Sequence, residues 1–315
     1  MAGTSPSNIR KILPGRGGQW LELSVTLPLS CVDAVAESLV ALGSPGVVED
    51  TAPSASPIHA GQASSMAKLI AAFPLEQMGD RLLGEVRRCI DALGSEAASR
   101  TTLAMRLTRG SAWWERWKQF YRPFKVGRRL VIRPPWEAYA AADDELVLTL
   151  NPGRAFGTGL HATSQLCLRA LERIAPARRG ATLLDVGCGS GILSLAGALF
   201  GFGGVLGVDL DATAVRVARA NARLNHLSEQ VSFATGSLEV VATRFEVIVA
   251  NILLEPILGM LQDFHAALTP GGTMILSGIL AAEVRELGRG LTKHGWRMMR
   301  KVTQDEWAAM VCAEA

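Results

Sequence analysis

The sequence predicts two domains of different architecture, a small α+β domain followed by a larger α/β domain. Three features support this fold class: the order of the elements expected before residue 110, the alternation of apolar strands and helices after residue 140, and a Trp- and Arg-rich segment between them. A chain of 315 residues is long enough for two hydrophobic cores. We expect a disordered tail at 1–18, a first domain at 19–110, an interdomain linker at 111–139 and a second domain at 140–315.

The first domain is expected to contain four strands and two helices. Apolar residues at helical spacing stop at Gly43, and segments of turn composition separate the short apolar runs. The expected elements are a strand at 19–26, a helix at 32–43, a strand at 46–50, a loop at 52–65, a strand at 67–73, a helix at about 80–93 and a strand at about 101–107. This β-α-β-β-α-β order is the ferredoxin-like plan.

The linker differs in composition from the segments on either side of it. Trp113, Trp114 and Trp117 favour a helix, and the prolines that follow favour an extended chain. Between Arg106 and Arg133 there are nine basic residues and one acid. Such a segment is typical of a hinge, of a docking surface, or of a packed linker whose arginines are solvated. Its composition does not distinguish these three roles.

In the second domain, apolar strands alternate with helical stretches. The expected strands are at 181–186, 204–209, 231–234, 245–250 and 272–277. This alternation predicts a mostly parallel sheet with helices on both faces. Because ligands of such sheets bind at the carboxyl ends of the strands, functional residues are expected there.

Composition narrows the class of protein and its setting. Hydrophobic residues make up 49% and charged residues 19%, as in globular enzymes, and a net charge of +3 is too small for a general nucleic-acid binder. The five cysteines include no Cys-x-x-Cys pair, which favours a reducing compartment and no structural metal. The first 18 residues favour a tail over a targeting segment, and the uncharged stretch 187–208 is too glycine-rich for a membrane span. We therefore expect a cytoplasmic protein.

The strongest local motif is the glycine turn in LLDVGCGSGILSLA, at 183–196. An apolar strand runs into Asp185, and Gly187, Gly189 and Gly191 follow it. Glycines let the backbone turn sharply and approach a ligand, and the next helix offers free N–H groups. Dinucleotide folds use Gly-x-Gly-x-x-Gly, whose third glycine position is Ile192 here. The spacing favours S-adenosylmethionine, although the turn alone leaves a dinucleotide open.

Two acids follow the next strand. Asp209, at its end, can accept hydrogen bonds from both hydroxyls of an adenosine ribose. The alternative is an ordinary strand-end acid on the surface, which the position of Asp209 after the glycine turn disfavours. Asp211 is expected to cap the following helix.

A further candidate segment is NPGRAFGTGLHATSQL, at 151–166. Its glycines lead into a helix whose start is marked by Thr163 and Ser164. Hydroxyls and free N–H groups at a helix N-terminus suit a carboxylate such as that of a methionine moiety. His161 is a candidate proton acceptor, but a lone loop histidine is expected to pack or cap instead.

Asn251 is the candidate catalytic residue. It stands at the carboxyl end of the fourth apolar strand, in VIVANILLEP at 247–256. Its amide and nearby carbonyls can orient an amine nucleophile beside a transferable methyl group. The alternative is a strand-end Asn that forms a turn.

Together these motifs resemble the bacterial methyltransferases of large-subunit ribosomal protein eleven, the PrmA family. The run 151–164 is similar to the family's DPGLAFGTGTHPTT, the glycine turn to its DVGCGSGILAIA, and ANIL recurs at 250–253. The linker is similar to the family's W-x-x-x-W and the F-H-P-M-R-F-G-x-R-L that follows it. The departures in the first run are modest: Asn151, Leu160, Ala162 and Ser164 stand where the family has other residues.

The resemblance implies a Rossmann-like methyltransferase domain that uses S-adenosyl-L-methionine. By the same likeness, the cofactor contacts fall on Thr163, Ser164, Gly187, Gly189, Asp209 and Asn251. The resemblance also implies that the first domain recognises the ribosomal protein, that the linker lets the catalytic domain reach several amines, and that lysine side chains and the N-terminal amine are methylated. We expect a monomer that binds no nucleic acid directly.

Methyl transfer to an amine requires alignment and a neutral nitrogen. A free lysine has a pKa of about 10.4, so only on the order of one in a thousand is neutral near pH 7.4. We therefore expect catalysis by proximity and orientation, with Asn251 positioning the nitrogen. Three alternatives remain: methylation of another protein lysine, such as that of an electron-transfer flavoprotein; an NAD-dependent oxidoreductase; and an RNA-associated module that uses the basic linker.

Overall fold

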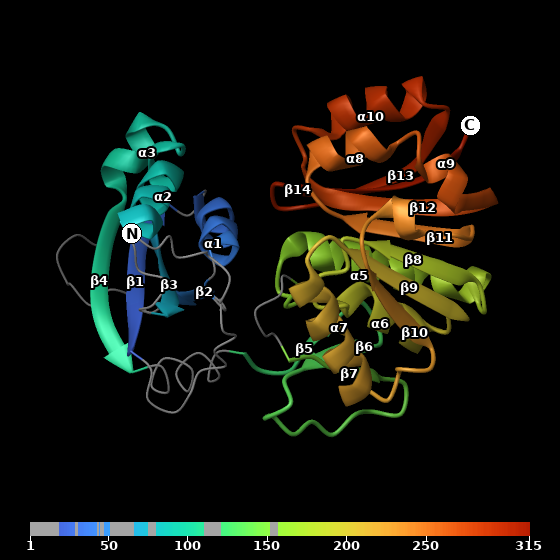
Figure 1. Ribbon diagram of the computed structural model, residues 1–315, viewed down its shortest axis with the longest axis horizontal. Helices are drawn as coiled ribbons and strands as arrows, with labels where there is room; N and C mark the ends of the chain where they lie inside the picture. Colours follow the sequence, from blue (N-terminus) through green and yellow to red (C-terminus); the bar gives the residue numbers. More distant parts are fainter. Residues whose placement is uncertain are drawn as a thin grey trace, which may run out of the picture. The chain divides into compact units, whose positions relative to one another are not determined.

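The computed structural model describes residues 19–28, 31–42, 44, 47–50, 66–74, 80–109, 121–151 and 157–315 (Figure 1). The chain forms two compact units, divided between Tyr121 and Arg122. The expectations for the tail, for the loop at 52–65 and for a helix through Trp113 and Trp117 lie outside the described residues. Within the described part of the chain, no helix is long and apolar enough to cross a membrane.

The N-terminal unit is an antiparallel sheet of four strands accompanied by helices. Its elements are β1 (Gln19–Pro28), α1 (Val32–Ala41), β2 (Val47–Asp50), β3 (Met66–Pro74), α2 (Asp80–Asp91), α3 (Ser95–Arg100) and β4 (Thr102–Arg109). The strand order in the sheet is β2-β3-β1-β4. Four strands and the first two helices were predicted from the sequence in this order, whereas the short helix α3 was not.

Alternation along β1 builds the core of this unit. Leu21, Leu23, Val25 and Leu27 are buried, because residues two apart in a strand point to the same face. They pack with side chains of β3, α1 and α2, among them Phe73. Each such buried side chain contributes roughly 1.5–3 kcal/mol relative to exposure, so this face holds the unit together.

The C-terminal unit begins earlier than the sequence suggested. Strands β5 (Phe124–Val126), β6 (Leu130–Arg133) and β7 (Leu146–Thr149) form a three-stranded sheet, antiparallel between β5 and β6 and parallel between β6 and β7. Val126, Leu130 and Ile132 are buried in the core of the C-terminal unit. Residues 122–139 are therefore part of that unit, and the expectation of a linker through 139 was wrong for them. The apolar residues of these strands are too few to show a period, but they fill space against α5 (Ala162–Ile174).

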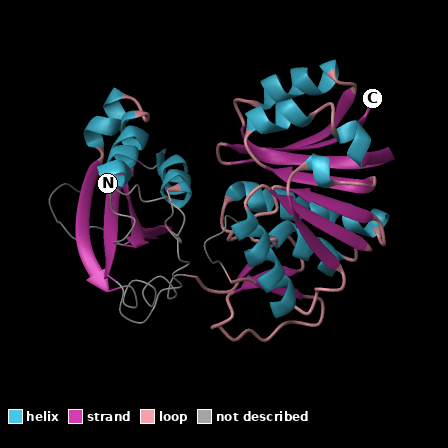
Figure 2. Ribbon diagram, viewed as in Figure 1, coloured by secondary structure: helices cyan, strands magenta, loops and turns pink. Residues whose placement is uncertain are grey.

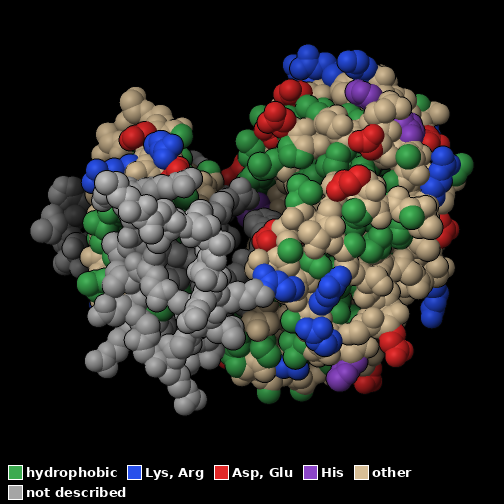
Figure 3. Space-filling view, viewed as in Figure 1, with side chains coloured by type: hydrophobic (Ala, Val, Ile, Leu, Met, Phe, Trp, Pro, Cys, Tyr) green, Lys and Arg blue, Asp and Glu red, His purple; other side chains and the backbone are tan. Residues whose placement is uncertain are grey.

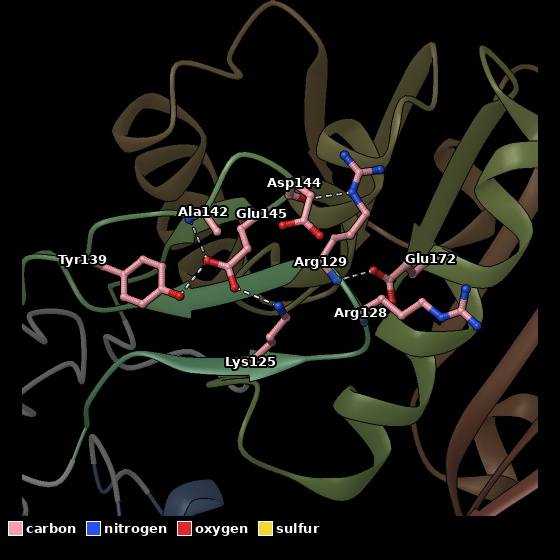
Figure 4. A network of polar contacts seen from close by, with 8 residues as sticks. All are labelled: Lys125, Arg128, Arg129, Tyr139, Ala142, Asp144, Glu145 and Glu172. Carbon is pink, nitrogen blue, oxygen red and sulfur yellow. Dashed lines mark hydrogen bonds and ion pairs between the residues drawn. The ribbon is translucent and has the colours of Figure 1, made fainter.

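Polar contacts fasten this small sheet at both ends (Figure 4). Glu145 accepts hydrogen bonds from Lys125 at 2.8 Å and from Tyr139 at 2.7 Å, and these bonds lower the pKa of its carboxyl to about 2. On the other side, the Glu172 carboxylate of α5 accepts the backbone N–H groups of Arg128 and Arg129, each at 2.8 Å. The turn between β5 and β6 is thereby held to the helix.

A seven-stranded sheet forms the centre of the C-terminal unit. Its strands are β8 (Thr182–Val186), β9 (Gly204–Asp209), β10 (Val231–Thr235), β11 (Phe245–Asn251), β12 (Leu268–Leu280), β13 (Trp296–Gln304) and β14 (Trp307–Glu314). The order is β10-β9-β8-β11-β12-β14-β13. The first five strands are parallel, and β14 and β13 are antiparallel. The mostly parallel sheet was predicted, and the antiparallel pair at its edge was not.

Helices cover both faces of this sheet (Figure 2). The helices α5, α6 (Ile192–Phe200) and α7 (Ala212–Leu224) pack on one face, and α8 (Leu254–Met260), α9 (Phe264–Ala267) and α10 (Val284–Lys293) pack on the other. Val247 and Val249 join the first core and Ile248 and Ala250 the second, because successive strand residues point to opposite faces. The apolar run 247–250 within β11 is therefore explained by burial on both sides.

Candidate cofactor and active site

The glycine turn lies directly after β8, as the motif predicted. Gly187, Gly189 and Gly191 have φ angles of 76°, 54° and 82°, in the left-handed region that other residues rarely adopt. A Cβ at Gly191 would lie 2.9 Å from Cζ of Phe233, so the turn has no room for a side chain there. The backbone N–H groups of Gly187 and Cys188 both donate to the carbonyl of Val208 at 2.9 Å, which fixes the turn against β9.

Asp209 holds the glycine turn and the next helix start together. Its Oδ2 accepts the backbone N–H of Gly189 at 2.8 Å, and its Oδ1 accepts that of Asp211 at 2.9 Å. A carboxylate has about four lone-pair positions, so each oxygen keeps capacity for a further donor. The structure thus adds a structural role to the predicted ribose contact. Asp211 accepts the N–H of Thr213 at 2.7 Å and is the N-cap of α7, which confirms that prediction.

Asp185 is wholly buried beneath the turn. Its Oδ2 accepts the hydroxyl and the backbone N–H of Ser194 at 2.6 and 3.0 Å. Its Oδ1 has no hydrogen-bond partner among the described residues. Burial raises the pKa of Asp185 to about 7, partly offset by the two bonds from Ser194, and the charge of Asp209 raises it further. Asp185 therefore secures the first turn of α6 from beneath the glycine turn.

The N-terminus of α5 is capped by His161. The Nδ1 atom of His161 lies 2.7 Å from the Thr163 hydroxyl and accepts its backbone N–H at 3.3 Å. The His161 ring meets the Trp307 ring edge-on, with centroids 4.8 Å apart. The prediction that His161 packs or caps is confirmed. Thr163 and Ser164 are each 1% exposed, so they lie beneath the surface and not on it.

Asn251 is the last residue of β11 and contacts the start of α5. Its Nδ2 donates to the Ser164 hydroxyl at 3.4 Å, a long hydrogen bond. Its Oδ1 is buried and has no partner among the described residues. A buried amide oxygen without a donor costs about 1–3 kcal/mol, so this atom is a candidate contact for a ligand.

The comparisons with known proteins agree over nearly the whole chain. The model of the family "Ribosomal protein L11 methyltransferase (PrmA)" matches residues 19–315. The chain belongs to this family. The resemblance found in the sequence is therefore confirmed, and the residues described above are those of an α/β methyltransferase.

Relatives within the L11 methyltransferase family share about a third of their residues with this chain. The ribosomal protein L11 methyltransferase of Syntrophotalea carbinolica is 38% identical over 302 residues, covering 92% of this chain and 97% of the relative. That of Geotalea daltonii is 32% identical over 303 residues, covering 92% and 96%. The crystal structure of the ribosomal protein L11 methylase from Lactobacillus delbrueckii subsp. bulgaricus is 32% identical with a TM-score of 0.58, and the match covers 62% of this chain and 99% of that one.

One residue that joins the family motifs was missed at the sequence level. Asn221 of α7 donates to the Ser190 carbonyl at 2.9 Å and accepts the Asn151 backbone N–H at 3.1 Å. The Ser190 hydroxyl in turn donates to the carbonyl of Gly157 at 2.6 Å. These bonds tie the glycine segment to the glycine turn. The signal available in the sequence was a polar residue three positions after Ala218, at helical spacing from it.

Proposed function

We propose that this chain transfers methyl groups from S-adenosyl-L-methionine to lysine side chains and the N-terminal amine of ribosomal protein L11. The observation that carries the proposal is the Asn251 amide, whose oxygen lacks a donor at the carboxyl end of β11, in a chain of the L11 methyltransferase family. The N–H group of an amine can donate a hydrogen bond to this oxygen.

The described residues fit S-adenosylmethionine. The side-chain-free turn through Gly187 and Gly189 lets a nucleoside approach the backbone, and the free acceptor positions on Asp209 suit ribose hydroxyls. The polar start of α5, with Thr163 and Ser164, suits the methionine carboxylate. When bound, S-adenosylmethionine supplies an electrophilic methyl group.

The residues of this chain then act by alignment. Asn251 and Ser164 would hold the neutral amine beside the methyl group, which S-adenosylmethionine would donate with release of S-adenosylhomocysteine, the amine proton going to solvent. Asn251 Oδ1 accepts an N–H of the neutral amine and so directs the nitrogen lone pair toward the methyl carbon. The Ser164 hydroxyl holds the Asn251 amide in place.

We assign substrate recognition to the N-terminal unit, as a ferredoxin-like domain. Its β-α-β-β-α-β order, with the additional short helix α3 before β4, and its strand order β2-β3-β1-β4 support this assignment. The same proposal includes a monomeric, cytoplasmic enzyme that binds L11 without direct contact to nucleic acid.

The test combines purified protein, labelled S-adenosylmethionine and L11 from a strain that lacks the enzyme. Intact-mass spectrometry is expected to show increments of one methyl group, and fragmentation locates the amines. The increments are expected to disappear in Asp209→Ala. If the protein binds the cofactor but transfers no methyl group to L11, its assignment as a methyltransferase stands and L11 is refuted as its acceptor.

A further inference from the structure

A hollow lies beside the candidate active site, between the start of α8, the start of α10 and the end of β12. It has a volume of about 460 Å³. Its lining consists of Leu253, Leu254, Glu255, Leu258, Gly278, Leu280, Glu283, Glu286 and Trp307. We call it the acidic pocket, because three of these residues are glutamates and none is lysine or arginine.

The carboxylates of the acidic pocket are available for a ligand. Glu255 and Glu286 are exposed, and in the described part of the chain neither forms an ion pair or a side-chain hydrogen bond. Glu283 accepts the backbone N–H of Leu280 at 2.8 Å and helps to start α10. Figure 3 shows acidic and hydrophobic side chains side by side at the upper left of the C-terminal unit, where α8 and α10 lie in Figure 1. The lining of the pocket therefore carries negative charge and no positively charged side chain.

A buried polar atom gives an independent indication of a ligand. Trp307 lines the acidic pocket and is only 6% exposed, yet its indole Nε1 has no partner among the described residues. Indole N–H groups are donors only, and a buried one normally finds an acceptor. A backbone carbonyl of a bound polypeptide is such an acceptor. Leu253 and Leu280, 64% and 37% exposed, offer apolar surface next to it.

The acidic pocket adjoins Asn251 through three connections. Leu253 stands two positions after Asn251, and the intervening Ile252 donates its N–H to the Ser277 carbonyl at 3.1 Å. Trp307 contacts the ring of His161, which caps the helix that carries Ser164. The acidic pocket therefore lies close enough to Asn251 to contact a polypeptide whose amine reaches that residue.

We propose that the acidic pocket binds a cationic stretch of the methyl-accepting protein, with lysine or arginine side chains flanking the target amine. This inference rests on the proposed function. The reacting amine must be neutral, so Glu255 and Glu286 serve the flanking cations, while the aliphatic stems of those side chains lie on Leu253 and Leu280. The pocket thus selects amines in basic surroundings.

The first test is kinetic and uses the full chain with L11 as acceptor. Exposed ion pairs contribute about 0.2–1 kcal/mol each, so the double variant Glu255→Gln, Glu286→Gln is expected to raise KM for the acceptor by roughly threefold to tenfold. The value of kcat and the Kd for S-adenosylmethionine are expected to stay within about twofold. Raised salt should reduce the difference between the two proteins, because it screens exposed charges.

The matched control is Glu229→Gln, an exposed glutamate in the turn before β10. It removes one negative charge outside the acidic pocket and is expected to leave KM unchanged. An unchanged KM in the double variant, or an equal rise in the control, would overturn the proposal. Thermal unfolding of all variants checks that the fold is retained.

A second measurement separates the acidic pocket from the proposed function. A fluorescently labelled peptide of alternating leucine and lysine pairs is titrated with the full chain and followed by anisotropy. Binding to the wild type that weakens at least threefold in the double variant, and not in Glu229→Gln, supports the pocket even if L11 is not methylated. Equal binding to all three proteins contradicts the pocket even if L11 is methylated.

Discussion

Gly189 donates its backbone N–H to Oδ2 of Asp209 at 2.8 Å, across 20 positions in the sequence. The other oxygen of the same carboxylate accepts the N–H of Asp211. One side chain therefore fixes the glycine turn after β8 and the start of α7 after β9. Each of its two oxygens keeps capacity for a further hydrogen-bond donor, such as a ribose hydroxyl in the proposed function.

Replacing Asp209 is expected to weaken cofactor binding strongly. Asp209→Ala removes both the anchor of the turn and the proposed ribose contacts. Hydrogen bonds to a charged group contribute about 1.5–3 kcal/mol, so the Kd for S-adenosylmethionine should rise on the order of tenfold to a hundredfold in calorimetry. Asp211→Asn is the control, because Asn also caps helices and the change in charge is the same. A similar loss of affinity for S-adenosylmethionine in Asp211→Asn would indicate a general effect of charge.

Asn251→Ala is expected to slow turnover far more than it weakens cofactor binding. Loss of the amide removes the acceptor that orients the amine, and misplacement of a nucleophile can cost about a hundredfold in rate. Single-turnover methyl transfer should fall by about that factor, while the Kd for S-adenosylmethionine stays within about threefold. Ser164→Ala should give a smaller defect of the same kind. Equal losses of rate and of cofactor affinity in Asn251→Ala would contradict a positioning role.

Asp185 predicts a pH dependence of stability. Its pKa is raised to about 7 in the folded protein, whereas an unfolded Asp titrates near 3.9. Between these values the folded state binds more protons, so the free energy of unfolding decreases as pH rises through this range. From pH 5 to pH 8 the decrease due to this group should be roughly 2–3 kcal/mol.

Urea unfolding of wild type and Asp185→Asn at both pH values measures this contribution. The Asn variant carries no charge at either pH, and its amide oxygen can still accept from Ser194. Its stability is therefore expected to depend less on pH by that amount. The same pH dependence in both proteins would place the titrating group elsewhere.

The cysteines are expected to fall into two classes of reactivity. Burial raises the pKa of Cys167 and Cys312 to about 12, and it also raises the pKa of Cys188. Cys31 and Cys89 are partly exposed. Because the thiolate is the reactive form, a disulfide reagent should label the latter pair in the folded protein and all five after unfolding. Rapid labelling of Cys188 in the native state would show that the glycine turn opens.

Gly127 is expected to be intolerant of a side chain. Its φ is +70°, and a Cβ would collide with the carboxylate of Glu172, which holds the turn in Figure 4. Left-handed backbone costs other residues about 1–2 kcal/mol, so with the displaced carboxylate Gly127→Ala should lose about 2–3 kcal/mol in thermal or urea unfolding. Gly288→Ala in α10 is the control: nothing lies within 4 Å of its Cβ, and it should gain about 0.5–1 kcal/mol. Equal effects at the two glycines would exclude this explanation.

Much of the architecture was predictable because its signals are local. The apolar runs that became β8 to β12 are each recognisable in a window of a few residues, and the glycine spacing marks the turn after β8. By contrast, the exposed edge strand β13 carries mostly exposed, polar residues and showed no burial pattern to recognise. Its place beside β14 depends on pairing between strands, not on the apolar content of its own residues.

The sequence by itself determined which residue types stand at the strand ends, among them Asp209 and Asn251. It also determined the family to which the chain belongs. Only the tertiary structure decided what those side chains meet: Gly189 for one and Ser164 for the other. It also decided that residues 122–139 complete the C-terminal unit and that Glu255 and Glu286 line one pocket with Trp307. The physical reason is that propensity and periodicity act over a few residues, whereas these contacts join segments far apart in the chain and exist only once the sheet has formed.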